Sequence, residues 1–329
     1  MRRIHRLIQH ISPTGKTMLT TQFSSASTYP LQQSLSSSMS VVPIDEAIVL
    51  KRQELHSQPL NQEDVLQCPI KFFYKWLEDA VAVKSDMPEK MVLSTVNIEE
   101  DGSIQPCARV VLLKDVCFDN TMFSPYALMK GINAYPTVHV SDFFNEQTSS
   151  QSELQGLSAR GGFCFVTNYN SNKGKQLAAN PRCGLNFHWP ELERVVRVSG
   201  VAYKVPASLS DRYHDQRPRG SQLAALTSHQ SRPVESREML ETRYRDIDQA
   251  LQAGITDIPD IEENIPTEKK EKLQTNLNMV PRPENWGGYV IIPSKFEFWQ
   301  GRGSRFHERL EVTADLTQDG KWTVKYLQP

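Results

Sequence analysis

The sequence predicts a mainly β protein with flanking helices, arranged as a closed or split β-barrel. Short apolar or β-branched runs recur after Pro88, and turn-rich pieces such as EEDGS (residues 99–103) separate them. Apolar residues at the i, i+3, i+4 spacing of helices occur in only a few segments. The chain has neither a βαβ rhythm nor a GxGxxG motif, so a barrel fits better than a Rossmann sheet.

Six to eight antiparallel strands are expected. Their ranges are 91–98, 108–116, 162–168, 183–189, 194–205, 289–301, 309–316 and 321–327. The Asp-Gly pair in DLTQDGKW predicts a hairpin between the last two strands. Helices are expected at 45–57, 62–83, 173–179 and 234–252, where apolar residues recur on one face or a proline ends the segment.

Composition suits a globular enzyme, with 39% hydrophobic residues, 23% charged residues and a net charge of −1. This balance gives no reason to expect nucleic acid or an anionic membrane as a partner. The five cysteines show no CxxC pair and are expected to be reduced thiols. The histidines form no metal motif, and no apolar run reaches the roughly 20 residues of a membrane span.

Residues 1–43 are expected to lie outside the folded domain, which covers 44–329. This first segment has no Asp or Glu, and its run RRIHRLIQHI can form a basic amphipathic helix. Such composition fits a mitochondrial transit peptide or a disordered tail, so both cytoplasmic and mitochondrial locations stay open. Two polar segments, 117–160 and 255–275, are expected to be surface insertions because they are long for loops in a compact domain.

Four segments combine cations and hydroxyls with apolar or aromatic residues. In RVVLLK, Arg109 and Lys114 stand at the two ends of an apolar strand. In TNYNSNKGK (167–175), polar groups and Lys173 gather at a helix start, which fits a phosphate site or a plain helix cap. Arg217 lies in the basic segment 213–231, and arginine is well shaped for phosphate.

The fourth segment, EFWQGRGSRFHER (297–309), places Arg305, His307 and Arg309 at a spacing of two. If the segment is a strand, the three side chains share one face and would repel one another without an anion between them. The alternative is a solvated basic edge strand. The spacing therefore favours an anionic ligand at this segment.

Taken in order, RVVLLK, TNYNSNKGKQLAANP, RPRGSQLAALTSHQS and WGGYVIIPSKFEFWQGRGSRFHER resemble the pyridoxamine 5'-phosphate oxidase family. The resemblance runs from about Pro59 to the C-terminus, apart from the two expected insertions. It implies an FMN-binding split β-barrel that forms a homodimer, with FMN between the subunits. The implied reaction oxidises pyridoxamine or pyridoxine 5'-phosphate to pyridoxal 5'-phosphate, with O2 as acceptor and H2O2 as product.

The resemblance also assigns residues to each ligand. The implied FMN contacts are Arg109, Val110, Val111, Leu112, Leu113, Lys114, Val166, Thr167, Lys173, Gln230, Ser231, Trp299 and Arg309. The implied substrate contacts are Lys114, Tyr213, Arg217, Ser221, Arg305 and His307. Arg305 and His307 are the implied catalytic pair, which would hold the substrate C4' over the flavin ring, and no metal is implied.

Two departures from the family pattern fall on the flavin side. Asn172 stands where the family has an arginine, and Val195 stands where it has a glutamine. Each lost contact would cost about 1–3 kcal/mol of FMN binding, unless a residue such as Lys175 compensates. The alternative to an active oxidase is therefore a non-catalytic relative of the same fold that binds pyridoxal phosphate or FMN.

Overall fold

The computed structural model describes residues 46–131, 138–145, 147–255, 265, 279–318 and 320–329. Chain contacts separate Met1–Pro43 from the compact unit Ile44–Pro329. The expected targeting or disordered segment lies outside the described residues. So does most of the second polar segment, of which only Ile255 and Ile265 are described. No described helix is long and apolar enough to cross a membrane.

Three helices open the described chain: α1 (Glu46–Ser57), α2 (Gln62–Gln67) and α3 (Pro69–Ala82). The single helix expected over residues 62–83 is therefore wrong. Cys68 has an extended backbone (φ −162°, ψ 97°), and Pro69 starts the next helix. A proline disfavours helical geometry in the residue before it and fits well at the first position of a helix, so the chain breaks here.

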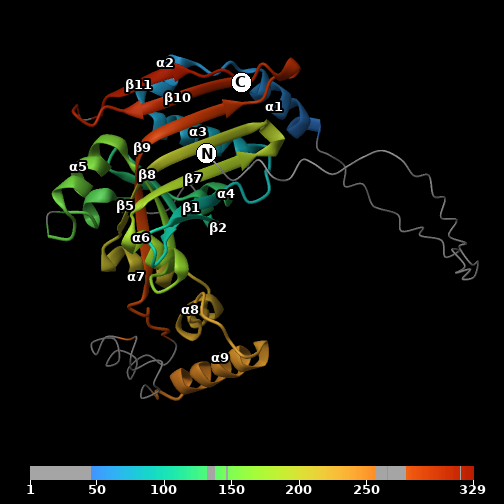
Figure 1. Cartoon of the computed structure of the whole chain (residues 1–329). Helices are drawn as coiled ribbons and strands as arrows, with labels where there is room; N and C mark the ends of the chain where they lie inside the picture. The colour runs from blue at the N-terminus through green and yellow to red at the C-terminus, as the bar shows by residue number, and fades with distance from the viewer. Residues whose placement is uncertain (1–45, 132–137, 146, 256–264, 266–278, 319) are drawn as a thin grey trace, which may run out of the picture. The chain divides into compact units, whose positions relative to one another are not determined.

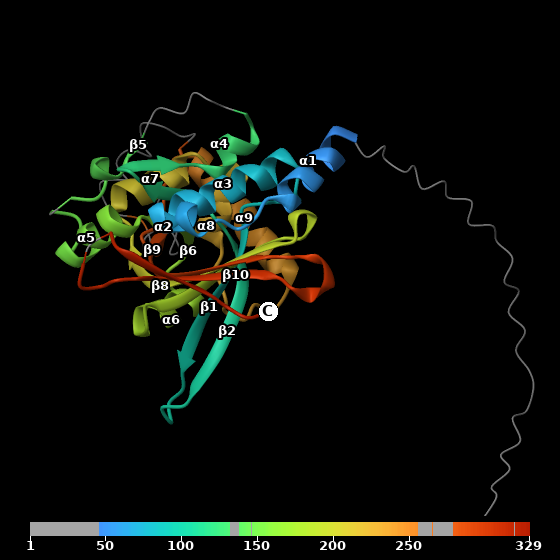
Figure 2. The ribbon, with the colours of Figure 1, turned by 90° about the horizontal axis from the view of Figure 1, so that it is seen from above.

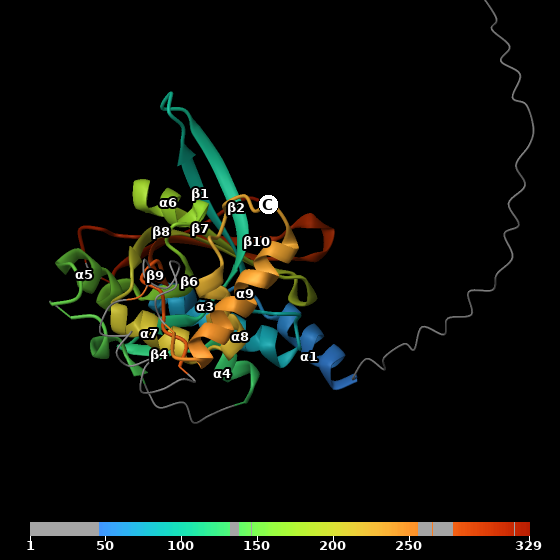
Figure 3. The same cartoon turned by 90° about the horizontal axis from the view of Figure 1, so that it is seen from below.

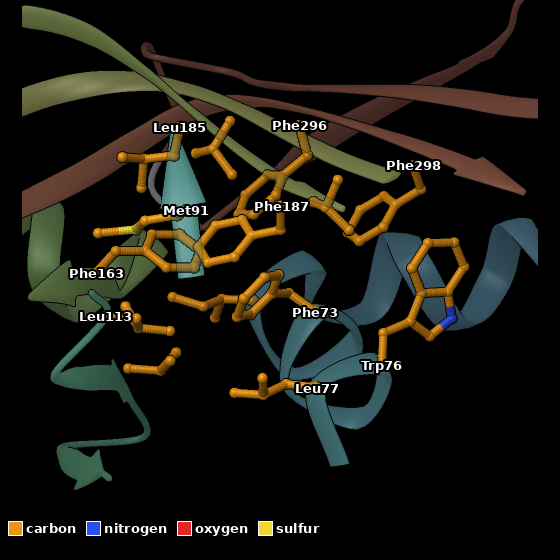
Figure 4. Packing of buried hydrophobic residues seen from close by; sticks show 14 of the residues in the cluster. Phe73, Trp76, Leu77, Met91, Leu113, Phe163, Leu185, Phe187, Phe296 and Phe298 are labelled. Atoms are coloured by element: carbon orange, nitrogen blue, oxygen red, sulfur yellow. The ribbon is translucent and has the colours of Figure 1, made fainter. Parts of the chain in front are cut away.

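Helix α3 supplies one side of the main core. Phe73 is fully buried and lies 4.9 Å from Phe163 and 4.6 Å from Phe187, measured between ring centroids. Trp76 packs edge-on against Phe298 at 5.4 Å. Figure 4 shows these aromatic side chains of the helix meeting those of the sheet. Burial of this apolar surface is the main force that fixes α3 against the sheet.

The described residues form an eleven-stranded antiparallel sheet, ordered β2-β1-β7-β8-β9-β6-β3-β4-β5, with β10 on β9 and β11 on β10. The strands are β1 (Lys90–Ile98), β2 (Ile104–Leu112), β3 (Asp115–Phe118), β4 (Thr121–Phe123), β5 (Val138–His139), β6 (Gly162–Asn168), β7 (Arg182–Trp189), β8 (Arg194–Lys204), β9 (Trp286–Gln300), β10 (Glu308–Ala314) and β11 (Trp322–Tyr326). The mainly β prediction is confirmed, with more strands than expected because several are short.

Strand β9 creates the split in the barrel. One of its edges pairs with β8 from Tyr289 to Gln300, whereas the other pairs with β6 up to Ile291 and with β10 from Lys295. Pro293, which has no N–H to donate, lies where the partner changes. A Cβ on Gly200, at the register shift in β8, would come within 2.4 Å of the Ile292 oxygen, so glycine permits this close approach. Figure 1 shows the long course of β9.

Residues 117–160, which were expected to be a surface insertion, contain regular secondary structure. The segment completes β3, adds β4 and β5, and carries α4 (Pro125–Met129), the short η1 (Val140–Asp142) and α5 (Gln151–Arg160). Cys117, Phe144 and Leu157 are buried in a second apolar cluster. The polar composition hid these elements because their apolar residues are few and widely spaced.

The β1–β2 hairpin reaches beyond the rest of the sheet. Its strands pair over nine residues, whereas only Val92–Ser94 of β1 pairs with β7. The outer half consequently projects into solvent, as Figures 2 and 3 show from two sides. Ile98 and Ile104, which pair across its tip, are 49% and 65% exposed.

The remaining helices are α6 (Asn172–Ala179), α7 (Ala207–Asp215), α8 (Arg219–Thr227) and α9 (Arg237–Gln252). Helix α7 packs against β9, and α8 packs against α9. The helices expected at 173–179 and 234–252 are confirmed to within a few residues. Ile247 and Leu251 of α9 are buried in one apolar cluster with Ile265, which belongs to the second polar segment.

Candidate active site

The start of α6 gathers four predicted cofactor residues. Ser171 caps the helix by accepting a hydrogen bond from the Gly174 N–H (3.2 Å). The Lys173 Nζ donates to Gln230 Oε1 (2.8 Å), and the Thr167 hydroxyl donates to the same oxygen (3.2 Å). The Asn172 N–H donates to the Ser231 hydroxyl (3.2 Å), so two predicted segments about 60 residues apart meet here. The predicted helix cap at the start of α6 is confirmed, and the phosphate site stays a prediction.

Arg109 of β2 lies beside the polar cluster at α6 and donates hydrogen bonds to three groups. Its guanidinium donates to Thr95 Oγ1 (2.6 Å), to Gln176 Oε1 (2.8 Å) and to the Leu93 carbonyl (3.3 Å). Partial burial lowers the pKa of Lys173, and the nearby charge of Arg109 lowers it further. Burial likewise lowers the pKa of Arg109. Two cations that destabilise each other at a helix N-terminus suit an anion such as a phosphate.

A cavity of about 290 Å³ opens where β2 ends and where α7 ends. Lys114, Val166, Tyr213 and Arg217, all predicted site residues, line it. Val166 precedes Thr167 in β6, so one strand serves both this cavity and the α6 cluster. Leu113 also lines the cavity, whereas Val110, Val111 and Leu112 do not. Val110 is 62% exposed.

The electrostatics of the cavity favour a negatively charged ligand. Burial lowers the pKa of Lys114, and the charge of Arg217 lowers it further. Arg217 lies over the ring of Trp286, 4.9 Å from its centroid, and burial lowers the pKa of this arginine too. The buried Nη1 of Arg217 has no hydrogen-bond partner within the described part of the chain. An unpaired buried donor is costly, so a ligand oxygen fits here.

Asp115 and Tyr213 form a buried pair at the wall of this cavity. The Tyr213 hydroxyl donates to Asp115 Oδ2 at 2.5 Å, and both side chains are almost completely buried. Burial raises the pKa of Asp115 to about 6, although the hydrogen bond from Tyr213 and the charges of Arg212 and Lys114 oppose this shift. The carboxyl therefore titrates close to neutral pH.

Ser221, the remaining predicted phosphate residue of this region, does not line the cavity. It lies in the first turn of α8, and its N–H donates to the Pro218 carbonyl (2.8 Å). Pro218 itself is part of the cavity wall. Ser221 is thus near the rim rather than inside.

The C-terminal segment departs from its predicted geometry. Residues Gly303–Arg305 form a short 3-10 turn, Arg305 has a φ of +64°, and β10 starts only at Glu308. The predicted alternation of Arg305, His307 and Arg309 along one strand is therefore wrong. The strand starts where its pairing with β9 starts, at Glu308 opposite Gln300, and the glycine-containing turn before it redirects the chain.

Trp299 nevertheless lies next to His307 and Arg309, two other predicted site residues. The His307 ring lies 4.8 Å from the Trp299 ring, and its Nδ1 accepts a hydrogen bond from the Arg302 N–H (3.1 Å). A neutral His307 therefore carries its proton on Nε2 and can donate it outward. Arg309 on β10 and Val195 on β8 are the cross-strand neighbours of Trp299. Val195, one of the two residues that depart from the family pattern, thus lies directly beside Trp299, a predicted flavin contact.

Within one chain, the Trp299 group and the cavity lie at opposite ends of β9. The cavity residue Arg217 contacts Trp286 at the start of the strand, and His307 contacts Trp299 thirteen positions later. At about 3.3 Å per residue, this is roughly 40 Å along the strand. Within one chain, the predicted residues of the cavity and those around Trp299 are therefore in two separate places.

Sequence reasoning missed several residues that the structure places in these sites. Asp115 directly follows RVVLLK, and Arg212 directly precedes Tyr213, so both were adjacent to predicted residues. Glu89, Thr95 and Gln176 carried no recognisable signal, because only folding brings them next to Lys114 and Arg109. No cluster of potential metal ligands occurs among the described residues.

The fold and these sites define a split-barrel protein whose two cation-rich places suit phosphorylated ligands. Residues 146–250 match the family model "Pyridoxamine 5'-phosphate oxidase", and residues 286–329 match "Pyridoxine 5'-phosphate oxidase C-terminal dimerisation region". The pyridoxine/pyridoxamine 5'-phosphate oxidase of Cupriavidus pinatubonensis is 36% identical over 270 residues, covering 82% of this chain and 93% of that protein. The chain belongs to the pyridoxine/pyridoxamine 5'-phosphate oxidase family.

One further relative supports the assignment of the family, and one solved structure supports the fold. The protein of the same name from Trichormus variabilis is 35% identical over 286 residues, covering 87% of this chain and all of that protein. Among solved structures, PhzG from Burkholderia lata in complex with tetrahydrophenazine-1-carboxylic acid superposes with a TM-score of 0.51. It is 21% identical and covers 84% of this chain and 96% of its own. This second likeness concerns the fold alone.

Proposed function

We propose that this protein is an FMN-dependent oxidase that converts pyridoxamine or pyridoxine 5'-phosphate to pyridoxal 5'-phosphate, with O2 as acceptor and H2O2 as product. The observation that carries the proposal is the cavity where Lys114, Tyr213 and Arg217 converge and where a buried Arg217 donor lacks a partner within the described chain. Family membership supports the reaction class, and the cavity supports a phosphorylated substrate.

The α6 cluster is the proposed site of the FMN phosphate. Lys173 and Arg109 supply charge, Thr167, Gln230 and Ser231 supply hydrogen-bonding groups, and the helix start supplies N–H donors. The backbone of residues 110–113, with Val166, Trp299 and Arg309, is proposed to hold the flavin ring. When bound, FMN supplies the hydride acceptor that O2 later reoxidises.

The chain's own residues mainly bind and orient the substrate. Lys114 and Arg217 neutralise the substrate phosphate, and the Arg217 guanidinium is held against Trp286 in a fixed direction. His307 offers its Nε2 proton as a hydrogen-bond donor, and Arg305 is proposed to hold C4' against the flavin. Ser221, at the rim, is proposed to contact the phosphate once it is bound.

A complete site requires two copies of the chain. The cavity and the Trp299 group are separated by roughly 40 Å of β9, farther than a B6 phosphate spans. In a two-fold dimer, the Trp299 group of one chain can face the cavity of the other. The match of residues 286–329 to a dimerisation region supports this arrangement.

Purification from the native host or a heterologous one tests the proposal directly. We expect a yellow protein that, given pyridoxamine 5'-phosphate in air, forms pyridoxal 5'-phosphate and H2O2 in equal amounts. Pyridoxamine without its phosphate is the matched control and should react far more slowly. A colourless protein that ignores added FMN would overturn the proposal. A protein that binds FMN and pyridoxal 5'-phosphate without turnover would instead be a non-catalytic relative.

A further inference from the structure

Asp115 is an acidic residue in the wall of a cavity whose other side chains suit the binding of an anion. It is 6% exposed, lines the cavity beside Lys114, and accepts a hydrogen bond from the Tyr213 hydroxyl at 2.5 Å. A carboxylate so close to a bound phosphate would repel it. This repulsion has to be relieved when a phosphorylated ligand enters.

The groups around Asp115 are of three kinds. Two cations, Lys114 and Arg212, lie near enough to lower its pKa. The neutral groups are Cys117 on the same strand, β3, and three groups from other elements, namely Tyr213 of α7, Tyr74 of α3 and Cys164 of β6. The remaining charged groups of the cavity are Glu89 and Arg217. Burial outweighs the cations, so the pKa of Asp115 is raised to about 6.

The Tyr213 hydroxyl has a single proton, so it can donate a hydrogen bond to only one acceptor at a time. Burial and the proximity of Asp115 hold the pKa of Tyr213 well above its usual value, so the hydroxyl stays protonated. While Asp115 is a carboxylate, that proton points at Asp115, and only oxygen lone pairs face elsewhere. When Asp115 is protonated, it can donate to the Tyr213 oxygen, and the tyrosine proton becomes free to point into the cavity.

We propose that Asp115 is a positioning residue that sets the direction of the Tyr213 hydroxyl and thereby couples the binding of a phosphorylated ligand to the uptake of one proton. This inference rests on the proposed function of the cavity. In the free protein the carboxylate holds the hydroxyl away from the ligand. In the complex, one proton from solvent occupies Asp115, and Tyr213 donates to a phosphate oxygen.

The proton balance predicts a particular pH dependence. No covalent bond other than the O–H bond on Asp115 forms, and the proton comes from the buffer. Ligand affinity should fall by up to about tenfold per pH unit above the pKa of Asp115 in the free protein, until the pKa in the complex is passed. Below that first pKa, the carboxyl is already protonated, and affinity should no longer depend on Asp115.

Calorimetric titration measures the linked proton directly. The FMN-loaded protein is titrated at pH about 7.5 with 4-deoxypyridoxine 5'-phosphate, which has no oxidisable group at C4', in buffers with different heats of ionisation. The change of binding heat with buffer gives the number of protons taken up. We expect the wild type to take up close to one proton more than Asp115→Asn, whose amide can donate permanently to the Tyr213 oxygen.

Two further variants separate the outcomes. Glu89→Gln removes another carboxylate from the same cavity and should leave the extra proton in place, because the Tyr213 hydroxyl donates to Asp115 and not to Glu89. Tyr213→Phe should bind more weakly and lose the extra proton. Equal proton uptake by wild type and Asp115→Asn, with the ligand bound by both, overturns the coupling alone. Failure of the wild type to bind the ligand overturns both the coupling and the proposed function of the cavity.

Discussion

Arg309 of β10 forms an ion pair with Glu297 of β9. Its Nη2 and Nε lie 2.8 Å and 3.0 Å from Glu297 Oε1. Glu297 is the cross-strand partner of Glu311. Glu297 is 7% exposed and also pairs with Arg197 of β8. The Glu297 carboxylate thus supplies part of the negative charge that the cationic C-terminal segment requires. Arg309 also donates to the Gln328 carbonyl (2.8 Å), so its position is fixed before any ligand arrives. Arg305 is exposed, and its role depends on what binds.

Replacing Arg305 should therefore affect chemistry more than cofactor binding. We expect Arg305→Ala to slow flavin reduction on the order of 100-fold while FMN affinity changes by less than about threefold, because only substrate orientation is lost. Anaerobic stopped-flow absorbance and fluorescence titration measure the two quantities. Lys325→Ala, an exposed cation on β11, is the control and should change neither. Flavin reduction at the wild-type rate would refute the role of Arg305.

Lys173 should dominate the charge at the FMN phosphate. We expect Lys173→Ala to weaken FMN binding about tenfold or more, since a charge-assisted hydrogen bond contributes roughly 1.5–3 kcal/mol. Lys175, suggested above as a substitute for the arginine missing at Asn172, is exposed on the same helix. Side chains two positions apart on a helix do not face each other, so Lys175→Ala should leave FMN affinity unchanged. Fluorescence titration of the apoprotein checks both, and a large effect of Lys175→Ala would reverse the assignment.

The two-chain site predicts complementation between inactive variants. Arg217→Ala and Arg305→Ala should each be nearly inactive as homodimers. If one chain supplies Arg217 and the other Arg305, a purified mixed dimer has one intact site and one doubly altered site. Its activity should then approach about half that of the wild type. Two different affinity tags allow the mixed dimer to be isolated, and an inactive mixed dimer would mean that both residues act within the same chain.

Asp115 should make stability depend on pH. Its pKa of about 6 in the folded protein lies above the ordinary aspartate value of 3.8, so its contribution to folding is fully present below pH 3.8 and is lost as pH rises through about 6. Above that range, the buried carboxylate of Asp115 lowers the free energy of unfolding by about 3 kcal/mol. Asp115→Asn, which stays neutral, should gain stability over the wild type by up to this amount as pH rises. Urea unfolding with saturating FMN at several pH values measures the difference.

The exposed Asp246→Asn provides the matched control for that series. Asp246 is exposed on α9, so Asp246→Asn removes a carboxylate without relieving burial, and above pH about 6 it should stabilise the protein less than Asp115→Asn does. If the two variants have the same effect on the unfolding free energy, Asp115 is not destabilised by burial. The proton coupling proposed for the cavity would then lose its physical basis.

Local sequence patterns predicted the parts of the fold that depend on local chemistry. Alternating β-branched runs located most of the long strands, and Ser171 with Asn180-Pro181 marked both ends of α6. The pattern failed at Cys68, where a proline divided one apolar periodicity into two helices. It also failed in residues 117–160, because short strands with few apolar residues resemble a loop.

By itself, the sequence determined the mainly β architecture, the helix start at α6, and the motifs that assign the chain to its family. Residue type and spacing carry this information, because periodicity and capping act over a few neighbouring positions. Only the tertiary structure decided that Lys173 meets Gln230, that Asp115 faces Tyr213, and that His307 stacks on Trp299. These contacts join distant segments through strand register and core packing. The 3-10 turn before Glu308 likewise follows from where β10 can pair with β9, so the expected stripe of three cations became one paired arginine, one stacked histidine and one exposed arginine.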